Sequence, residues 1–188
     1  WFLEDVMEVY GRVDLLVNNA GTATPRTNVE DLSRSDIRAI VNTNLVGTYW
    51  FLMKVLPIMK AQGSGTIVNI GSKAGRVPSP GAAMYSASKA AVHALTQAVA
   101  REVRATKIRV VTVSPGAMNT EMRQTTDGDA AKQQSPEFVA QVITSIVTLG
   151  YPSYVGGSPV WLNGPIPNGA DVLVWKNEVR IHPMEELK

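Results

Sequence analysis

Short runs of apolar, β-branched residues alternate along this chain with longer segments of helical pattern. The five runs are typical of strands buried in a sheet: Val13–Val17, Thr66–Ile70, Arg109–Val113, Val172–Trp175 and a weaker Pro159–Leu162. Strands and helices in alternation predict βα units, and therefore an α/β domain with a parallel sheet that helices cover on both faces. Ligands of such sheets bind beyond the carboxyl ends of the strands.

Three helices are predicted around these strands, over Ser33–Lys60, Ala82–Arg104 and Ser135–Thr148. The first is long enough to contain a break, for which Gly47 is the candidate. The third opens with a serine N-cap followed by proline, which favours the first position of a helix. The weakest part of the prediction is Gly150–Gly169, which is rich in glycine and proline.

The beginning of the chain has the pattern of a helix and not of a leader peptide. Trp1–Tyr10 is predicted as the second half of an amphipathic helix, with Phe2, Val6 and Val9 on one side. A domain rarely starts in the middle of a helix. We therefore expect this chain to be a fragment from which the first β-α-β units of the fold are absent.

Composition narrows the class of protein. The 188 residues, 45% hydrophobic and 18% charged, suit one globular domain. A net charge of +2 without a dense run of Lys or Arg gives no reason to expect a nucleic-acid partner. No apolar run approaches the ~20 residues of a membrane span. The chain has no cysteine, which excludes disulfides and thiolate metal sites and is compatible with a reducing compartment.

Small, polar or turn-forming residues follow three of the predicted strands. They are Asn18-Asn19-Ala20-Gly21, Gly71-Ser72 and Ser114-Pro115-Gly116. Because parallel strands end at one edge of the sheet, these segments predict a crevice that a flat ligand can approach closely.

A tyrosine and a lysine stand four residues apart on a predicted helix, in Tyr85-Ser86-Ala87-Ser88-Lys89. Positions i and i+4 share a helix face, and an ammonium beside a phenol lowers the phenol pKa. The pair is therefore a candidate proton donor and acceptor, although a simple surface pair has the same spacing. Ser72 could bind a substrate oxygen or merely cap a turn. Asn44, a poor helix former, could serve a polar site, bond locally to the backbone, kink the helix or simply be exposed on its surface.

Several motifs occur together in a recognisable order. They are LLVNNAG, with Asn19, Ala20 and Gly21; NTNLVGTYW, with Asn44; IVNIGSKAG, with Ser72; YSASK at Tyr85–Lys89; and RVVTVSPGAMNTEM. This set resembles the short-chain dehydrogenase/reductase family in order and spacing, over roughly Asp14 to Met122. The family's Gly-rich turn after its first strand, T-G-x-x-x-G-x-G, has no counterpart in this sequence.

The resemblance implies a single NAD(P)-binding Rossmann-fold domain over residues 1–188, with a doubly wound parallel sheet. It implies an oxidoreductase that transfers hydride between a nicotinamide cofactor and a small carbonyl or alcohol substrate. Tyr85 would be the general acid/base and Lys89 would lower its pKa and bind the nicotinamide ribose. Ser72 would polarise the substrate oxygen, and Asn44 would hold a water that relays protons from Lys89.

The cofactor contacts implied by the resemblance are Asn19, Ala20, Gly21, Ile70, Tyr85, Lys89, Pro115, Gly116, Met118 and Thr120. NADP is slightly favoured over NAD, by analogy with reductive members of the family. A cytoplasmic location and a homodimer or homotetramer of the full-length protein are also expected. Because pyrophosphate is bound by a Gly-rich turn at a helix N-terminus, this chain alone is expected to be inactive. A non-catalytic fragment or partner subunit with the same fold is the alternative.

No metal site is expected. The two histidines, His93 and His182, have no carboxylate or second histidine at ligand spacing in the sequence. His93 follows Lys89 on the same predicted helix and is interpreted as a packing or interface residue.

Overall fold

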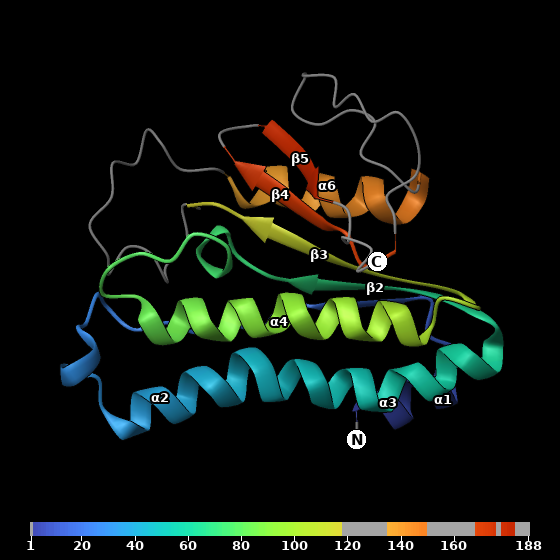
Figure 1. Cartoon of the computed structure of the whole chain (residues 1–188). Coiled ribbons are helices and arrows are strands. Elements are labelled where there is room, and N and C mark those ends of the chain that lie inside the picture. Colours follow the sequence, from blue (N-terminus) through green and yellow to red (C-terminus); the bar gives the residue numbers. More distant parts are fainter. Residues whose placement is uncertain (1, 118–134, 150–167, 176–177, 183–188) are drawn as a thin grey trace.

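The computed structural model describes residues 2–117, 135–149, 168–175 and 178–182, and the structural statements below concern those residues. Five strands form one sheet in the order β1-β2-β3-β4-β5. The parallel strands are β1 (Leu15–Asn18), β2 (Ser64–Ile70), β3 (Lys107–Pro115) and β4 (Asp171–Trp175), and β5 (Glu178–His182) runs antiparallel to β4 (Figure 1). The predicted α/β architecture with a parallel sheet is confirmed.

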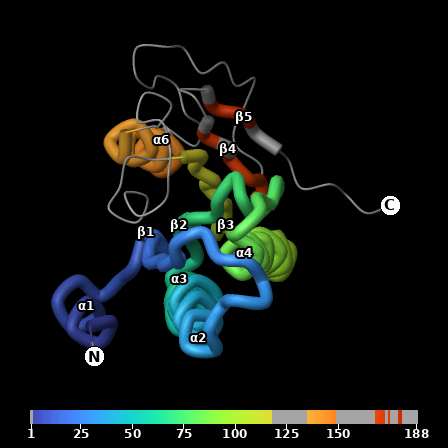
Figure 2. The backbone as a smooth tube through the Cα atoms, turned by 90° about the vertical axis from the view of Figure 1, so that its left-hand side faces the viewer, coloured from blue at the N-terminus to red at the C-terminus, as the bar shows by residue number. Residues whose placement is uncertain are grey.

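Helices cover both faces of the sheet, with α6 (Pro136–Leu149) on one side and α3 (Gly47–Gln62) and α4 (Ala83–Glu102) on the other (Figure 2). The α6 face packs Val142 and Ile146 against strand residues such as Val111. The opposite face packs Val55 of α3 and Val99 of α4 against the sheet. Burial of apolar side chains on both faces is the main stabilising contribution to the fold.

The apolar runs predicted as strands contribute side chains to both of these cores. Successive residues of a strand point to opposite faces. Ile67 of β2 accordingly packs towards α3 and α4, whereas Val68 and Ile70 pack towards α6. A strand buried on both faces therefore has a continuous apolar run in place of alternation.

One long helical segment runs from α2 (Arg34–Val41) through the π-helical turn η2 (Asn42–Val46) into α3. It begins at Ser33, whose side chain accepts a hydrogen bond from the Asp36 N–H at 3.1 Å, as expected of an N-cap. The break considered at Gly47 does not occur. The helix instead widens just before it, and the Gly47 N–H donates to the Asn42 carbonyl five residues earlier.

Other sequence predictions hold to different degrees. The helix at the start, α1 (Phe2–Tyr10), is present, but none of its residues is buried. The cap predicted for α6 is confirmed, because Ser135 Oγ accepts from the Phe138 N–H at 3.2 Å. Strand β5 was not predicted, and the weak strand Pro159–Leu162 lies outside the described residues. Within the part of the chain that the structure describes, no helix is long and apolar enough to cross a membrane.

Two short turns complete the described elements: η1 (Val29–Asp31) and η3 (Lys73–Gly75). The second matters for the site, because it follows the carboxyl end of β2 and leads towards α4. Its N-cap is Ser72, whose Oγ accepts a hydrogen bond from the Ala74 N–H at 3.1 Å.

Candidate active site

A cleft of about 600 Å³ opens beyond the carboxyl ends of the strands. Ser72 contributes to its wall from the turn after β2, and Tyr85 contributes from the first turn of α4. Gly116 lines it directly after β3. The rest of the wall is mainly apolar and comes from three segments: Ala23–Leu32, residues 37–40 of α2, and Val77–Ala87.

The two hydroxyl groups of the cleft influence each other. Burial raises the pKa of the Tyr85 phenol, and a hydrogen bond with the Ser72 side chain acts in the opposite direction. The lowered Tyr85 pKa expected from the Tyr–Lys spacing is therefore wrong for the chain as it stands. The reason is that the removal of water outweighs the favourable contacts of the phenolate.

Lys89 lies one helical turn after Tyr85, and its side chain is buried, with 4% of the residue exposed. Its ammonium donates to the Ile70 carbonyl at the end of β2, at 2.7 Å. Burial lowers the pKa of Lys89 to about 8. A side chain added at Gly21 would lie 3.4 Å from Lys89 Nζ, so the structure brings Gly21, Ile70 and Lys89 together.

Asn44 is 1% exposed and lies inside the π-helical turn. Its side-chain oxygen accepts from the Thr22 N–H at 2.7 Å, and its amide donates to the Thr22 carbonyl and to Ser88 Oγ, both at 3.0 Å. These bonds join the segment after β1 to α4. Of the alternatives considered for Asn44, an exposed side chain is excluded, and the side-chain amide is engaged with protein groups.

The implied cofactor residues do not all lie at the cleft. Asn19 and Ala20 line a second hollow of about 350 Å³ beside β1, together with Phe2 and Phe51. Gly116 lies at the cleft, and its N–H donates to the Val174 carbonyl at 2.8 Å, while Pro115 ends β3. The predicted contacts Met118 and Thr120 fall outside the described residues.

Comparison with known proteins decides the family. The family model for short chain dehydrogenases matches residues 2–131. The 3-oxoacyl-[acyl-carrier-protein] reductase FabG of Thermotoga maritima is 36% identical over 172 residues, covering 86% of this chain and 69% of the relative. The chain belongs to the short-chain dehydrogenase family. It spans about two thirds of the length of the curated relatives that it matches, for example 66%, 67% and 69% of three of them.

Solved structures agree with this assignment. A 3-ketoacyl-(acyl-carrier-protein) reductase of Brucella melitensis, complexed with NADH, has a TM-score of 0.74 and 29% identity, covering 82% of this chain and 67% of that one. ElxO with NADP bound has a TM-score of 0.63 and 33% identity, covering 65% of this chain and 50% of that one. The chain is therefore an oxidoreductase-family protein with an NAD(P)-binding type of fold.

The donor groups present fit one half of a nicotinamide dinucleotide. Lys89 supplies a buried ammonium beside the cleft, and Tyr85 supplies a hydroxyl on its wall. A ribose hydroxyl or a carboxamide oxygen could accept hydrogen bonds from donors of this kind. The pyrophosphate end is different, because the sequence contains no turn of the pattern T-G-x-x-x-G-x-G.

Sequence analysis missed a polar ladder behind the site. The Asn18 amide donates to Asn69 Oδ1 at 2.8 Å, and the Asn69 amide donates to Thr96 Oγ1 at 2.9 Å. Asn69 is fully buried, one residue before the end of β2. An asparagine within an apolar run was the sequence feature that could have indicated it, because a buried amide needs partners. The ladder joins β1, β2 and α4.

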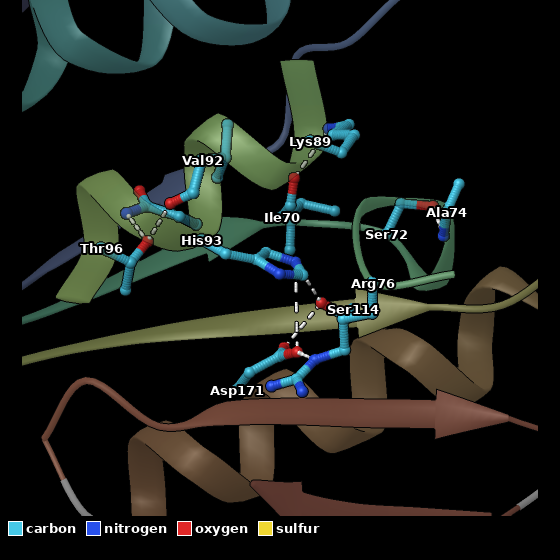
Figure 3. A network of polar contacts seen from close by, with 11 residues as sticks. Ile70, Ser72, Ala74, Arg76, Lys89, Val92, His93, Thr96, Ser114 and Asp171 are labelled. Atoms are coloured by element: carbon cyan, nitrogen blue, oxygen red, sulfur yellow. Dashed lines mark hydrogen bonds and ion pairs between the residues drawn. The ribbon is translucent and has the colours of Figure 1, made fainter. Parts of the chain in front are cut away.

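A second polar cluster was also missed, and it changes the interpretation of His93. His93 Nε2 lies 3.0 Å from Ser114 Oγ and 4.0 Å from an oxygen of Asp171 (Figure 3). The sequence placed no carboxylate near His93, but folding does. Burial lowers the pKa of His93, and Asp171 acts in the opposite direction. Among the side chains described, no group of three or more His, Asp or Glu residues could hold a metal ion.

Proposed function

We propose that this protein is an oxidoreductase that transfers hydride between NAD(P)(H) and a small carbonyl or alcohol, with Tyr85 as the acid/base. The observation that carries the proposal is the pair of hydroxyls on one wall of the cleft, where Ser72 lies near enough to Tyr85 to counteract the rise in the Tyr85 pKa that burial causes. The buried ammonium of Lys89, one helical turn away, supports it. Perturbed titratable groups gathered at a cleft are typical of catalytic sites.

Each group has a specific task in this reaction. Ser72 Oγ accepts from the Ala74 N–H, and its single hydroxyl proton can turn from Tyr85 to the substrate oxygen when substrate binds. Tyr85 gives its proton to the carbonyl oxygen in reduction and takes it back from the alcohol in oxidation. Lys89, with a pKa of about 8, is mostly protonated at neutral pH and favours the phenolate. The nicotinamide ring, when bound, supplies or accepts the hydride.

NADP(H) is proposed ahead of NAD(H). ElxO holds NADP and is 33% identical to this chain, whereas the Brucella reductase, at 29%, was solved with NADH. Initial rates of NADPH and NADH oxidation with a panel of apolar ketones would measure the preference. An equal or higher kcat/KM with NADH would contradict this order.

Tyr85→Phe tests the role of the tyrosine. In the full-length protein, this substitution should remove nearly all turnover while cofactor binding stays close to normal, because only the ionisable hydroxyl is lost. Tyr10→Phe is the matched control, since Tyr10 is 73% exposed at the end of α1. Turnover of Tyr85→Phe above a few per cent of that of Tyr10→Phe would refute the assignment.

The 188-residue chain by itself is proposed to bind dinucleotides weakly and to be inactive, which keeps a non-catalytic partner subunit as the second candidate. Two observations favour this. The sequence contains no turn of the pattern T-G-x-x-x-G-x-G, and β1 is an edge strand of the described sheet, with Leu15 40% exposed. Titration of the purified chain with NADPH and NADH, followed by nicotinamide fluorescence, is the test. Micromolar binding would contradict the proposal.

Self-association and a cytoplasmic location complete the proposal. Four large apolar side chains are exposed on α3, namely Tyr49, Trp50, Phe51 and Met53. Large apolar side chains exposed on one helix are typical of an interface, which supports a homodimer or homotetramer of the full-length protein. Cell fractionation with an antibody against the chain would test the location.

A further inference from the structure

The segment that carries Ser72 is held to the sheet by four polar residues, which we call the Asp171 cluster: Arg76, His93, Ser114 and Asp171 (Figure 3). Asp171 Oδ2 pairs with Arg76 Nε, and Asp171 Oδ1 accepts from Ser114 Oγ at 2.6 Å. His93 Nε2 lies 3.0 Å from the same Ser114 oxygen. The cluster therefore joins the turn after β2 to α4, β3 and β4.

This cluster contains the residue types of a hydrolytic triad but not its order. Ser114 stands between His93 and Asp171, and its only proton is donated to the carboxylate. Its oxygen must then accept from His93 Nε2, so His93 cannot act as a base towards it. Ser114 is also fully buried and does not line the cleft. The cluster is therefore suited to bracing and not to nucleophilic attack.

Close packing holds the backbone on both sides of Ser72. A Cβ added at Gly71 would lie 2.5 Å from His93 Nε2 and 2.6 Å from Ser114 Oγ. A Cβ added at Gly75 would lie 2.8 Å from the backbone carbon of Lys89. Gly71 therefore packs against the Asp171 cluster and Gly75 packs against α4, and Ser72 lies between these two glycines.

The ion pair between Arg76 and Asp171 holds the end of the segment that begins at Ser72. Asp171 is 4% exposed at its side chain, whereas that of Arg76 is 31% exposed. A buried carboxylate without a counterion is costly, so Asp171 strongly favours the one placement of Arg76 that neutralises it. Arg76 is bound in turn to η3, because its N–H donates to the Lys73 carbonyl at 3.0 Å. The position of Arg76 therefore fixes the turn that begins at Ser72.

We propose that Asp171 and Arg76 are positioning residues that keep the Ser72 hydroxyl in contact with Tyr85. The inference rests on the proposed function only in that Ser72 and Tyr85 are the reacting pair. It assigns to β4 a part in the geometry of the site. Asp171 lies beyond residues 2–131, the part of the chain that the family model matches.

The Ser72–Tyr85 contact can be observed directly by NMR of the chain labelled with [¹³Cζ]tyrosine. The Cζ shift of a tyrosine reports the hydrogen bonding of its hydroxyl at neutral pH, without substrate or cofactor. The chain has five tyrosines, and Tyr85→Phe identifies the resonance of Tyr85. Ser72→Ala sets the shift that corresponds to complete loss of the contact.

Asp171→Asn and Arg76→Gln should each move the Tyr85 resonance at least half as far as Ser72→Ala, in the same direction. Arg76→Lys retains the positive charge and should restore at least half of the difference seen with Arg76→Gln. Arg12→Gln is the control, because it breaks the exposed pair of Arg12 with Asp14, whose side chains are 57% and 63% exposed. It should leave the resonance unchanged.

The proposal is overturned if Arg76→Gln lowers the thermal stability but leaves the Tyr85 resonance in place, since that is the behaviour of a purely structural ion pair. It is also overturned if Arg76→Lys behaves like Arg76→Gln. If Asp171→Asn does not fold, the two Arg76 variants alone decide. Because the measurement needs no turnover, its failure is distinguishable from failure of the proposed oxidoreductase activity.

Discussion

Gly71 precedes Ser72, and its replacement by alanine introduces one methyl group into the packed interior. The new Cβ would lie 2.5 Å from His93 Nε2 and 2.6 Å from both Ser114 Oγ and Thr112 Cγ2. All three neighbours belong to short side chains on α4 and β3. Relief by rotation of a long, flexible side chain is therefore not available, and either the backbone or the Asp171 cluster must shift.

The expected cost follows from two contributions. Overpacking of a well-packed interior costs about 1–3 kcal/mol, and loss of the His93–Ser114 hydrogen bond adds about 1 kcal/mol. We therefore expect Gly71→Ala to lower the free energy of unfolding by about 2–4 kcal/mol, which raises the unfolded fraction roughly 30- to 900-fold. With a urea m-value of about 2 kcal/mol/M, the midpoint should fall by about 1–2 M.

Urea unfolding followed by tryptophan fluorescence measures this midpoint. Gly47→Ala is the matched control, because a Cβ at Gly47 has only the Asn42 carbonyl oxygen, at 3.4 Å, within contact distance. Alanine also favours a helix by about 1 kcal/mol over glycine, so this variant should be at least as stable as the unsubstituted chain. A Gly71→Ala midpoint equal to that of the unsubstituted chain would refute the close packing inferred at this position.

Three further predictions concern charge, the polar ladder and assembly. Because burial lowers the pKa of Lys89 to about 8, the unfolded chain binds more protons than the folded chain above that pH. Stability should therefore rise from about pH 8 towards pH 10 by up to about 1.4 kcal/mol per pH unit, and a Lys89→Met variant that kept this rise in urea titrations would contradict the assignment. Asn69→Ala leaves the buried Asn18 amide without its partner and should cost about 1–3 kcal/mol in the same assay; an unchanged midpoint would argue against the ladder. Light scattering of the full-length protein should give a dimer or tetramer that Trp50→Glu weakens, and a monomer of the unsubstituted protein at micromolar concentration would rule the interface out.

The sheet was predictable because its central strands are buried on both faces. Val68 and Ile67 lie in different cores, and such strands stand out as continuous apolar runs. Strand β5 was missed for the complementary reason. Glu178–His182 alternates polar and apolar residues, as a strand at the edge of a sheet does, and a search for continuous runs does not detect that pattern.

The site was only partly predictable, since spacing along a helix gives proximity but not environment. The four-residue separation of Tyr85 and Lys89 placed them on one face, but the direction of the Tyr85 pKa depends on burial. The pairing of Arg76 with Asp171 joins residues 95 positions apart. Such a contact depends on the complete sheet, and nothing local to either residue indicates it. The π-helical turn around Asn44 likewise depends on Thr22, which lies on another segment.

The hydroxyl and ammonium groups of the candidate site and the segments that line the cleft are held by different hydrogen bonds. Ser72 accepts a hydrogen bond from Ala74 in η3, and Lys89 donates to Ile70 at the end of β2. The turn that begins at Ser72 is also joined to β4 through Arg76 and its ion pair with Asp171. Two of the segments that line the cleft, Ala23–Leu32 and Val77–Ala87, are instead joined to each other by hydrogen bonds. Arg26 donates to the Pro80 carbonyl at 2.6 Å, and the Thr27 N–H donates to the Gly81 carbonyl at 3.0 Å. Substitutions at Arg26 or Thr27 should therefore reshape the cleft more than they disturb the hydroxyl pair, because the hydrogen bonds of these two residues to Pro80 and Gly81 involve none of the four residues of the Asp171 cluster.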